Sequence, residues 1–188
     1  MGEIHTLWEG VVEYPSMSGE KLQDEWEDLR RFFASFHPQE VAGESLLTLH
    51  LPGGVEGMVS LHALPLKRGE YKASLIVKLE AKEPVGQDGL VTVSKILKWL
   101  EKNVPHPTIY TCLKGTGSGK LDTFRSEIVS LVTKRVNGKW GEFYEDARSW
   151  SARISGNGDA PFQLLLHEEA DRGVTQVILG TPYIATEF

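Results

Sequence analysis

Residues 70–82 alternate between apolar and polar side chains, and this alternation limits the fold more than any other feature of the chain. In "EYKASLIVKLEAK" the apolar side chains occupy every second position: Tyr71, Ala73, Leu75, Val77, Leu79 and Ala81. Most of the intervening residues are lysine, serine or glutamate. A strand with one apolar and one polar face is typical of an antiparallel sheet with one side in water. The sequence therefore predicts a partly solvated antiparallel sheet.

Two further strands are expected just before this one, at residues 45–51 and 56–64. Turn-forming residues separate them, with Gly53-Gly54 between the first two strands and Lys67–Gly69 before the third. The three segments should form a meander, in which each strand pairs with the next along the chain.

Helical spacing appears twice. The first helix is expected to begin after Ser18, whose hydroxyl suits an N-cap, and to end before Pro38. Its apolar residues recur three or four positions apart: Leu22, Trp26, Leu29, Phe33 and Phe36. The second helix is expected over residues 90–103. Trp99 falls outside the apolar stripe of that helix, so we expect its side chain to be exposed.

The remaining strands are expected at residues 4–14, 108–113, 150–155, 161–168 and 173–180, with turns at 157–158 and 170–173. Residues 122–147 fit either a helix or a hairpin around Asn137-Gly138, and we favour a short helix followed by extended chain. The predicted fold is α+β, a largely antiparallel sheet of about eight strands with two main helices packed on one face. We expect one domain over residues 1–188, with possible seams near 84–89 or 114–121.

Composition narrows the class of protein. The chain of 188 residues has a single cysteine, Cys112, which cannot form an internal disulfide and is expected to be buried. We find no secretion signal at the start and no membrane span, so we expect a cytoplasmic protein without a membrane partner. The formal net charge of −6 disfavours nucleic acid and favours a protein partner with a basic surface. We expect neither a cofactor nor a bound metal.

The glycine-rich stretch at residues 114–120, "KGTGSGK", resembles a phosphate-binding loop only superficially. Lys114 occupies the position where a P-loop needs its first glycine, and Leu121 follows Lys120 where a hydroxyl is required. Successive amides could still form an anion-binding nest flanked by two lysines. That alternative site comprises Lys114, Gly115, Gly117, Ser118, Gly119 and Lys120. A mobile connection without a ligand is the reading we favour.

Histidines offer few candidates for chemistry. His50 and His62 lie on neighbouring predicted strands, but neither is followed by the hydroxyl residue that paired histidine motifs of phosphodiesterases require. His167 lies among acids near a predicted turn, where charged residues are ordinary. We assign no catalytic residue, and the chemical role of these three histidines stays open.

The strongest candidate surface is an aromatic and acidic segment, residues 140–146. It comprises Trp140, Glu142, Phe143, Tyr144, Glu145 and Asp146. Aromatic side chains supply anchoring area in protein interfaces, while carboxylates steer a basic partner. The leading hypothesis is a non-enzymatic intracellular protein-binding module, of the inhibitor or immunity-protein type. The alternative is a protein that binds a small ligand or nucleotide phosphate through residues 114–120.

Overall fold

The computed structural model describes residues 4–136, 138–155 and 161–181, apart from the side chains of Val136 and Glu142. These ranges contain three α-helices and ten strands, so the α+β prediction is confirmed with more strands than the expected eight. Every strand ladder given below is antiparallel. The chain divides into two compact units. Residues 8–81 and 85–109 form the first unit, and residues 1–7, 82–84 and 110–188 form the second. The single-domain expectation stays a prediction.

The first unit contains the predicted meander. Its strands are β2 (Gln39–Glu40), β3 (Leu46–Leu51), β4 (Val55–Pro65), β5 (Glu70–Ala81) and, from Trp8 onward, β1 (Ile4–Ser18), in the order β2-β3-β4-β5-β1. The ladders β2–β3, β3–β4 and β4–β5 are antiparallel, as the alternation over residues 70–82 predicts. β1 runs past Pro15, where the sequence suggested that it ends. Proline's φ is compatible with an extended chain, and Met17 beyond it is buried in the core.

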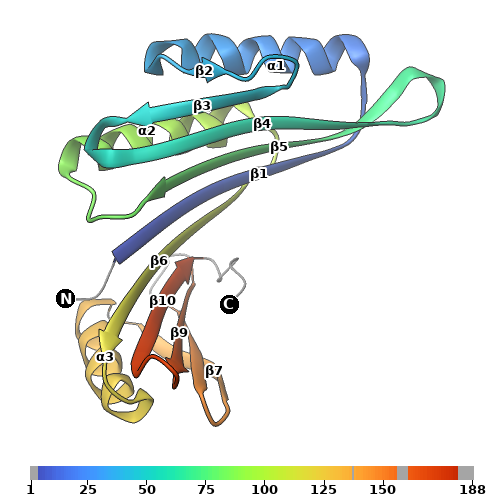
Figure 1. Ribbon diagram of the computed structural model, residues 1–188. Helices are drawn as coiled ribbons and strands as arrows, with labels where there is room; N and C mark the ends of the chain where they lie inside the picture. Colours follow the sequence, from blue (N-terminus) through green and yellow to red (C-terminus); the bar gives the residue numbers. More distant parts are fainter. Residues whose placement is uncertain (1–3, 137, 156–160, 182–188) are drawn as a thin grey trace. The chain divides into compact units, whose positions relative to one another are not determined.

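Both helices of this unit pack on the same face of its sheet, as expected (Figure 1). They are α1 (Gly19–Phe33) and α2 (Gln87–Asn103). Phe33 from α1 and Ile96 from α2 are fully buried in one core with the inward side chains of β3, β4 and β5. Ser18 caps α1 as predicted, because its Oγ accepts a hydrogen bond from the Lys21 amide at 3.2 Å.

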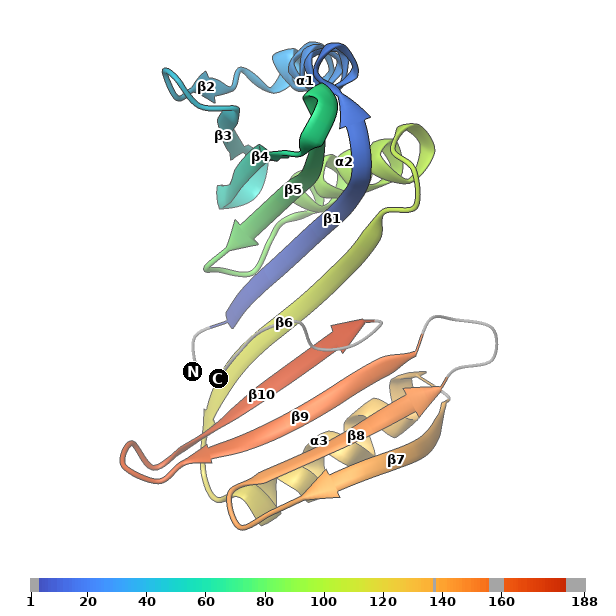
Figure 2. The same ribbon diagram turned by 90° about the vertical axis from the view of Figure 1, so that its right-hand side faces the viewer.

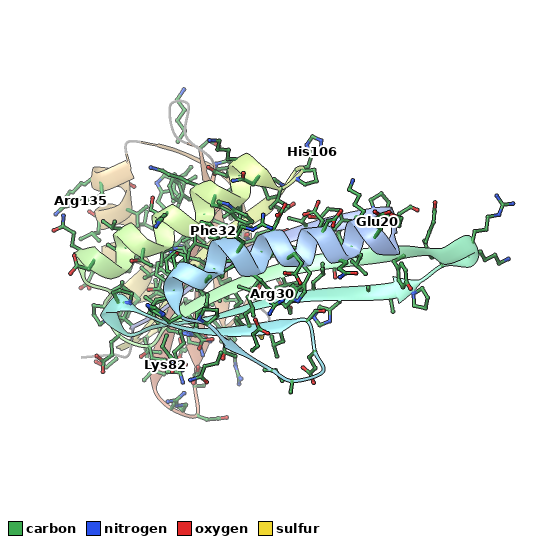
Figure 3. The ribbon with its side chains drawn as sticks, turned by 90° about the horizontal axis from the view of Figure 1, so that it is seen from above. Glu20, Arg30, Phe32, Lys82, His106 and Arg135 are labelled. Atoms are coloured by element: carbon green, nitrogen blue, oxygen red, sulfur yellow. The ribbon has the colours of Figure 1, made fainter. Side chains whose placement is uncertain are left out.

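Trp99 corrects the sequence expectation of an exposed side chain. Its ring stacks on Phe32 of α1, with ring centroids 4.2 Å apart and planes 14° from parallel. Figure 3 shows Phe32 on the side of α1 that faces α2, and Arg30 on the side toward β2. Arg30 forms an ion pair with Glu40 of β2 at 2.8 Å. The two helices therefore contact each other as well as the sheet, which a single-helix periodicity does not reveal.

The β4–β5 hairpin extends beyond the sheet as a narrow ribbon (Figures 1 and 3). We call residues 62–72 the finger. Its two strands stay paired as far as Pro65 and Tyr71, and the Leu66 amide donates to the Glu70 carbonyl at 2.7 Å. The turn at the tip, Lys67–Gly69, places Arg68 in the left-handed region at φ 68°. The finger is thus a preformed hairpin down to its turn.

The second unit pairs five strands in the order β6-β10-β9-β8-β7 and packs one helix against them (Figure 2). They are β6 (Thr108–Ser118), β7 (Lys139–Glu145), β8 (Ser149–Ser155), β9 (Phe162–Glu169) and β10 (Val174–Thr181), with helix α3 at Leu121–Val136. Its core joins Leu121 of α3 to Trp150, Ile154, Leu164 and Leu166 of β8 and β9. The helix expected within residues 122–147 is therefore present, longer than predicted, and β7 is the extended chain after it.

Residues 114–118 correct another expectation, because they belong to β6 instead of a loop. Gly115 pairs with Val177 of β10, and Gly117 pairs with Thr175. A Cβ placed on Gly117 would lie 1.9 Å from Cζ of Phe124 in α3, far inside normal contact. The strand therefore needs glycine at this position so that the α3 side chain can lie against it.

Candidate protein-docking site

β7 carries most of the predicted aromatic and acidic segment and is the last strand of its sheet. It pairs with β8 on one side, and within the described ranges no strand pairs with its other edge. The register slips between Trp140 and Phe143, which marks a bulge around Gly141. Bulges re-aim side chains and interrupt the regular ladder of an edge strand. A partner can therefore reach this edge. The bulge disfavours pairing with a long, regular strand from that partner.

A groove of about 330 Å³ lies between α3 and the strands β7 and β8. Helix α3 contributes one face, and the two strands contribute aromatic and small side chains. The groove is lined by Asp122, Arg125, Ser126, Val129, Trp140, Gly141, Phe143, Trp150 and Ala152. A volume near the lower end of the range of about 300–1,000 Å³ for ligand sites suits one or two inserted side chains.

Two tryptophans line this groove and contact each other. The ring centroids of Trp140 and Trp150 are 5.8 Å apart, and Trp150 is buried in the core of the second unit. Nε1 of Trp140 donates a 2.8 Å hydrogen bond to Oγ1 of Thr133 in α3. The Arg125 guanidinium lies 5.0 Å from the centroid of the Trp150 ring, a cation–π distance. These contacts fix the groove's shape before any partner arrives.

Phe143 and Tyr144 are the exposed aromatic side chains of β7. Phe143 is 71% exposed and lines the groove, while Tyr144 is 59% exposed. Neighbouring side chains point to opposite faces of a strand. One ring is therefore available to a partner on each face of the sheet at this edge. Large apolar groups are usually covered in a folded chain, and such exposure at an open edge is typical of a binding surface.

The carboxylates of the segment differ in their surroundings. Glu145 forms an ion pair with Arg125 at 2.7 Å, on the rim of the groove. Asp146 instead holds the turn to β8, because its Oδ1 accepts hydrogen bonds from the amides of Arg148 and Ser149 at 2.8 and 2.7 Å. The side chain of Glu142 lies outside what the structure describes.

Hydrogen bonding shifts the pKa of two of these groups. The pKa of Asp146 is held below its ordinary value, mainly by the Arg148 amide and then by the Tyr144 hydroxyl. The pKa of Tyr144 is raised in turn, mainly by its 3.0 Å hydrogen bond to that carboxylate. Asp146 therefore keeps its negative charge well into the acid range, and Tyr144 stays a neutral hydrogen-bond donor.

The alternative anion site looks different from the nest that the sequence suggested. Lys114, Gly115, Gly117 and Ser118 are β6 residues whose strand pairs with β10. The Gly119 carbonyl accepts a hydrogen bond from Oγ1 of Thr175 at 2.8 Å. At the start of α3, the Leu121 amide donates to a carboxylate oxygen of Glu168 at 3.1 Å. An internal carboxylate thus already occupies the helix terminus next to Gly119 and Lys120.

The remaining candidates are not brought together. His50 pairs with Glu56 and His62 with Ser74, and both histidines are exposed on their strands. Nδ1 of His167 lies 2.9 Å from Oγ of Ser149. Across the described ranges, no three His, Cys, Asp or Glu side chains gather as a metal site. Cys112 is buried, as expected. None of the helices there is long and apolar enough to cross a membrane.

Sequence reasoning found Trp140 and Phe143 but missed the helical side of the groove. Asp122, Arg125 and Val129 recur at helical spacing along α3, which places them on one face of the helix. That spacing was a usable signal. The position of Trp150 below them depends on how α3 packs against β8, which no local pattern specifies.

Comparison with known proteins provides no family: no protein-family model matches the chain, and no curated protein matches it.

Proposed function

We propose that this chain is a protein-binding module that docks on a partner through the edge of β7 and the groove beside it. The observation that carries the proposal is the exposure of Phe143 and Tyr144 on an unpaired strand edge next to an apolar groove. A cytoplasmic inhibitor or immunity-type protein is the class that we propose. Two contacts within the groove, from Trp140 to Thr133 and from Arg125 to Trp150, support docking at this site. They hold the lining side chains in place, and a surface that is already ordered loses little conformational entropy on binding.

The partner proposed here presents a basic surface. The whole chain has a formal net charge of −6, so its long-range field attracts cations. Asp146 and Glu145 add carboxylates at the end of β7, although Arg125 neutralises part of the charge of Glu145. We therefore assign steering of the partner to the acidic segment and most of the binding free energy to the aromatic side chains.

Paired serine substitutions test this proposal. The double variant Phe143→Ser/Tyr144→Ser removes both exposed rings, and Leu131→Ser serves as a matched control. Leu131 is 58% exposed on α3 and does not line the groove. Removal of either ring should weaken binding of the partner by about 30-fold, which corresponds to a hot-spot contribution of about 2 kcal/mol. The control should bind as the wild type does.

Capture from the native host's extract, compared across the three proteins, gives the readout. The proposal requires a protein that is retained by the wild type and the control and lost by the double variant. The partner should then bind the pure chain with an association rate that falls as salt rises from about 0.05 to 0.5 M. If no protein distinguishes the double variant from the control, or if the distinguishing protein is acidic and insensitive to salt, the proposal is wrong.

The alternative of an anion-binding nest at residues 114–120 stays a prediction. The β6–β10 pairing and the Glu168 carboxylate at the Leu121 amide do not favour it.

A further inference from the structure

The finger contains the longest continuous run of exposed residues in the described part of the first unit. Residues 62–70 are all exposed, although Leu64 and Leu66 within them are apolar. Leu64 is 67% exposed and Leu66 is 46% exposed. Leu64 lies in β4, and Leu66 follows the end of that strand with an extended backbone. Because the two leucines are two positions apart in extended chain, both belong to the same face of the hairpin. A protruding hairpin with two apolar side chains on one face is shaped to enter a concave surface.

The finger is also basic, in contrast to the acidic chain that carries it. It contains Lys67, Arg68 and Lys72 and one acid, Glu70. The Glu70 carboxylate accepts a hydrogen bond from the Ser16 hydroxyl. Within the described part of the chain, neither Lys67 nor Arg68 takes part in an ion pair, so the cations at the tip are available to a partner.

The groove beside β7 has the complementary properties. Its walls are aromatic and aliphatic, which suits a leucine side chain, and Phe143 at its entrance is 71% exposed. Asp122 lines it, and Glu145 lies on its rim through the ion pair with Arg125. The groove is thus apolar within, and its edge carries the two carboxylates of Asp122 and Glu145 against the single cation of Arg125, which leaves the edge acidic. The finger has the same arrangement with the opposite charge.

We infer that the finger of one copy docks in the β7 groove of a second copy, so that the chain associates with itself head to tail. The inference rests on the proposed function of the groove and names a second copy of this chain, which presents its basic finger, as a partner that fits it. Leu64 and Leu66 enter the groove, and Lys67 and Arg68 pair with the acidic rim. Finger and groove are different surfaces, so after one contact the first copy still has a free groove and the second a free finger, and further copies can add to form rings or open chains.

Complementary defects make this contact testable. The finger variant is Leu64→Ser/Leu66→Ser, and the groove variant is Asp122→Lys/Phe143→Ser. Leu131→Ser is again the control, with Phe143→Ser alone as a milder groove variant in case the double change disturbs α3. The substituted leucines and Phe143 are each at least 46% exposed, and Asp122 is also exposed, so all variants should still fold. Thermal unfolding checks that they do.

Sedimentation velocity from about 10 µM to 1 mM measures the result, a range that covers weak association constants. The wild type and control should gain mean mass with concentration, and less so at high salt. Each variant alone should remain monomeric. An equimolar mixture should form a 1:1 dimer that does not grow, because one variant supplies an intact groove and the other an intact finger.

Three results overturn the inference. These are a wild type that stays monomeric over the whole range, a mixture that stays monomeric while the wild type associates, and self-association that only one of the two variants abolishes. In the last case the contact is symmetric, between two fingers or between two β7 edges. The separate partner capture distinguishes this failure from that of the proposed function. If the finger variant still captures the host partner and the groove variant does not, the groove binds another protein and only the self-association is wrong.

Discussion

Replacing Gly117 with alanine tests the structural reason for the glycine-rich stretch. The added Cβ would lie 1.9 Å from Cζ and 2.6 Å from Cε1 of Phe124. Carbon atoms in contact prefer separations of about 3.5–4.0 Å, so the ring or β6 must move by roughly 1.6 Å or more. Overpacking of this kind costs about 1–3 kcal/mol, and we place this overlap near the upper end.

A smaller gain offsets part of that cost, because alanine restricts the unfolded chain and contributes about 0.4–1 kcal/mol in favour of folding. The expected net loss in free energy of unfolding is therefore about 2 kcal/mol. For a chain of this length such a loss lowers Tm by about 4–8 °C. Urea unfolding followed by tryptophan fluorescence should show a lower midpoint with an unchanged slope.

The matched control is Gly141→Ala in β7, where the nearest contact of the new Cβ is the Arg153 carbonyl at an ordinary 3.6 Å. Its stability should change by less than about 0.5 kcal/mol. In a Phe124→Ala background, Gly117→Ala should become nearly neutral, which gives a coupling of about 2 kcal/mol in the double-mutant cycle. If Gly117→Ala alone is harmless, or if its cost is the same without the Phe124 ring, the packing explanation is wrong and the glycine is needed for another purpose.

Two more predictions follow from single contacts. Trp99→Ala should lower the free energy of unfolding by about 2–3 kcal/mol, because it removes both the half-buried ring and its stack on Phe32. Urea unfolding measures this loss. A loss below about 1 kcal/mol would show that the packing of α1 on α2 does not depend on this contact. Asp146 should stabilise the fold above about pH 4 and lose that contribution as pH falls through its lowered folded-state pKa, since the carboxylate is charged more easily folded than unfolded. Thermal unfolding of Asp146→Asn and wild type between about pH 2 and 7 should therefore converge at the acid end, and a constant difference across the range would contradict the role of the charged form.

Local patterns predicted the first unit well because its elements follow one another along the chain. The alternation in β5, the turns on either side of β4 and the Ser18 cap are each complete within a few residues. Trp99 was misjudged because its partner Phe32 belongs to a different helix. Periodicity identifies the face that a helix turns to its sheet. It does not predict which side chains contact a second helix.

The second unit was harder for the same physical reason. Asn137-Gly138 is a strong hairpin signal, and it competed with the helical spacing of residues 121–136. The glycine at residue 117 looked like a loop residue because its explanation, Phe124, lies in the following helix. For the candidate site, the segment 140–146 was visible as an aromatic cluster, whereas Arg125 and Trp150 joined it only through the packing of α3 on β8.

The backbone conformation of Arg68 at the tip of the finger affects how a substitution there would change the stability of the fold. Its left-handed φ of 68° costs a residue with a Cβ about 1–2 kcal/mol, which glycine avoids and asparagine reduces. Arg68→Gly should therefore make the fold more stable while deleting a cation from the tip. A chain selected for thermal robustness alone would carry the easier residue, so Arg68 sets the stability of this turn against the cation that the proposed docking uses.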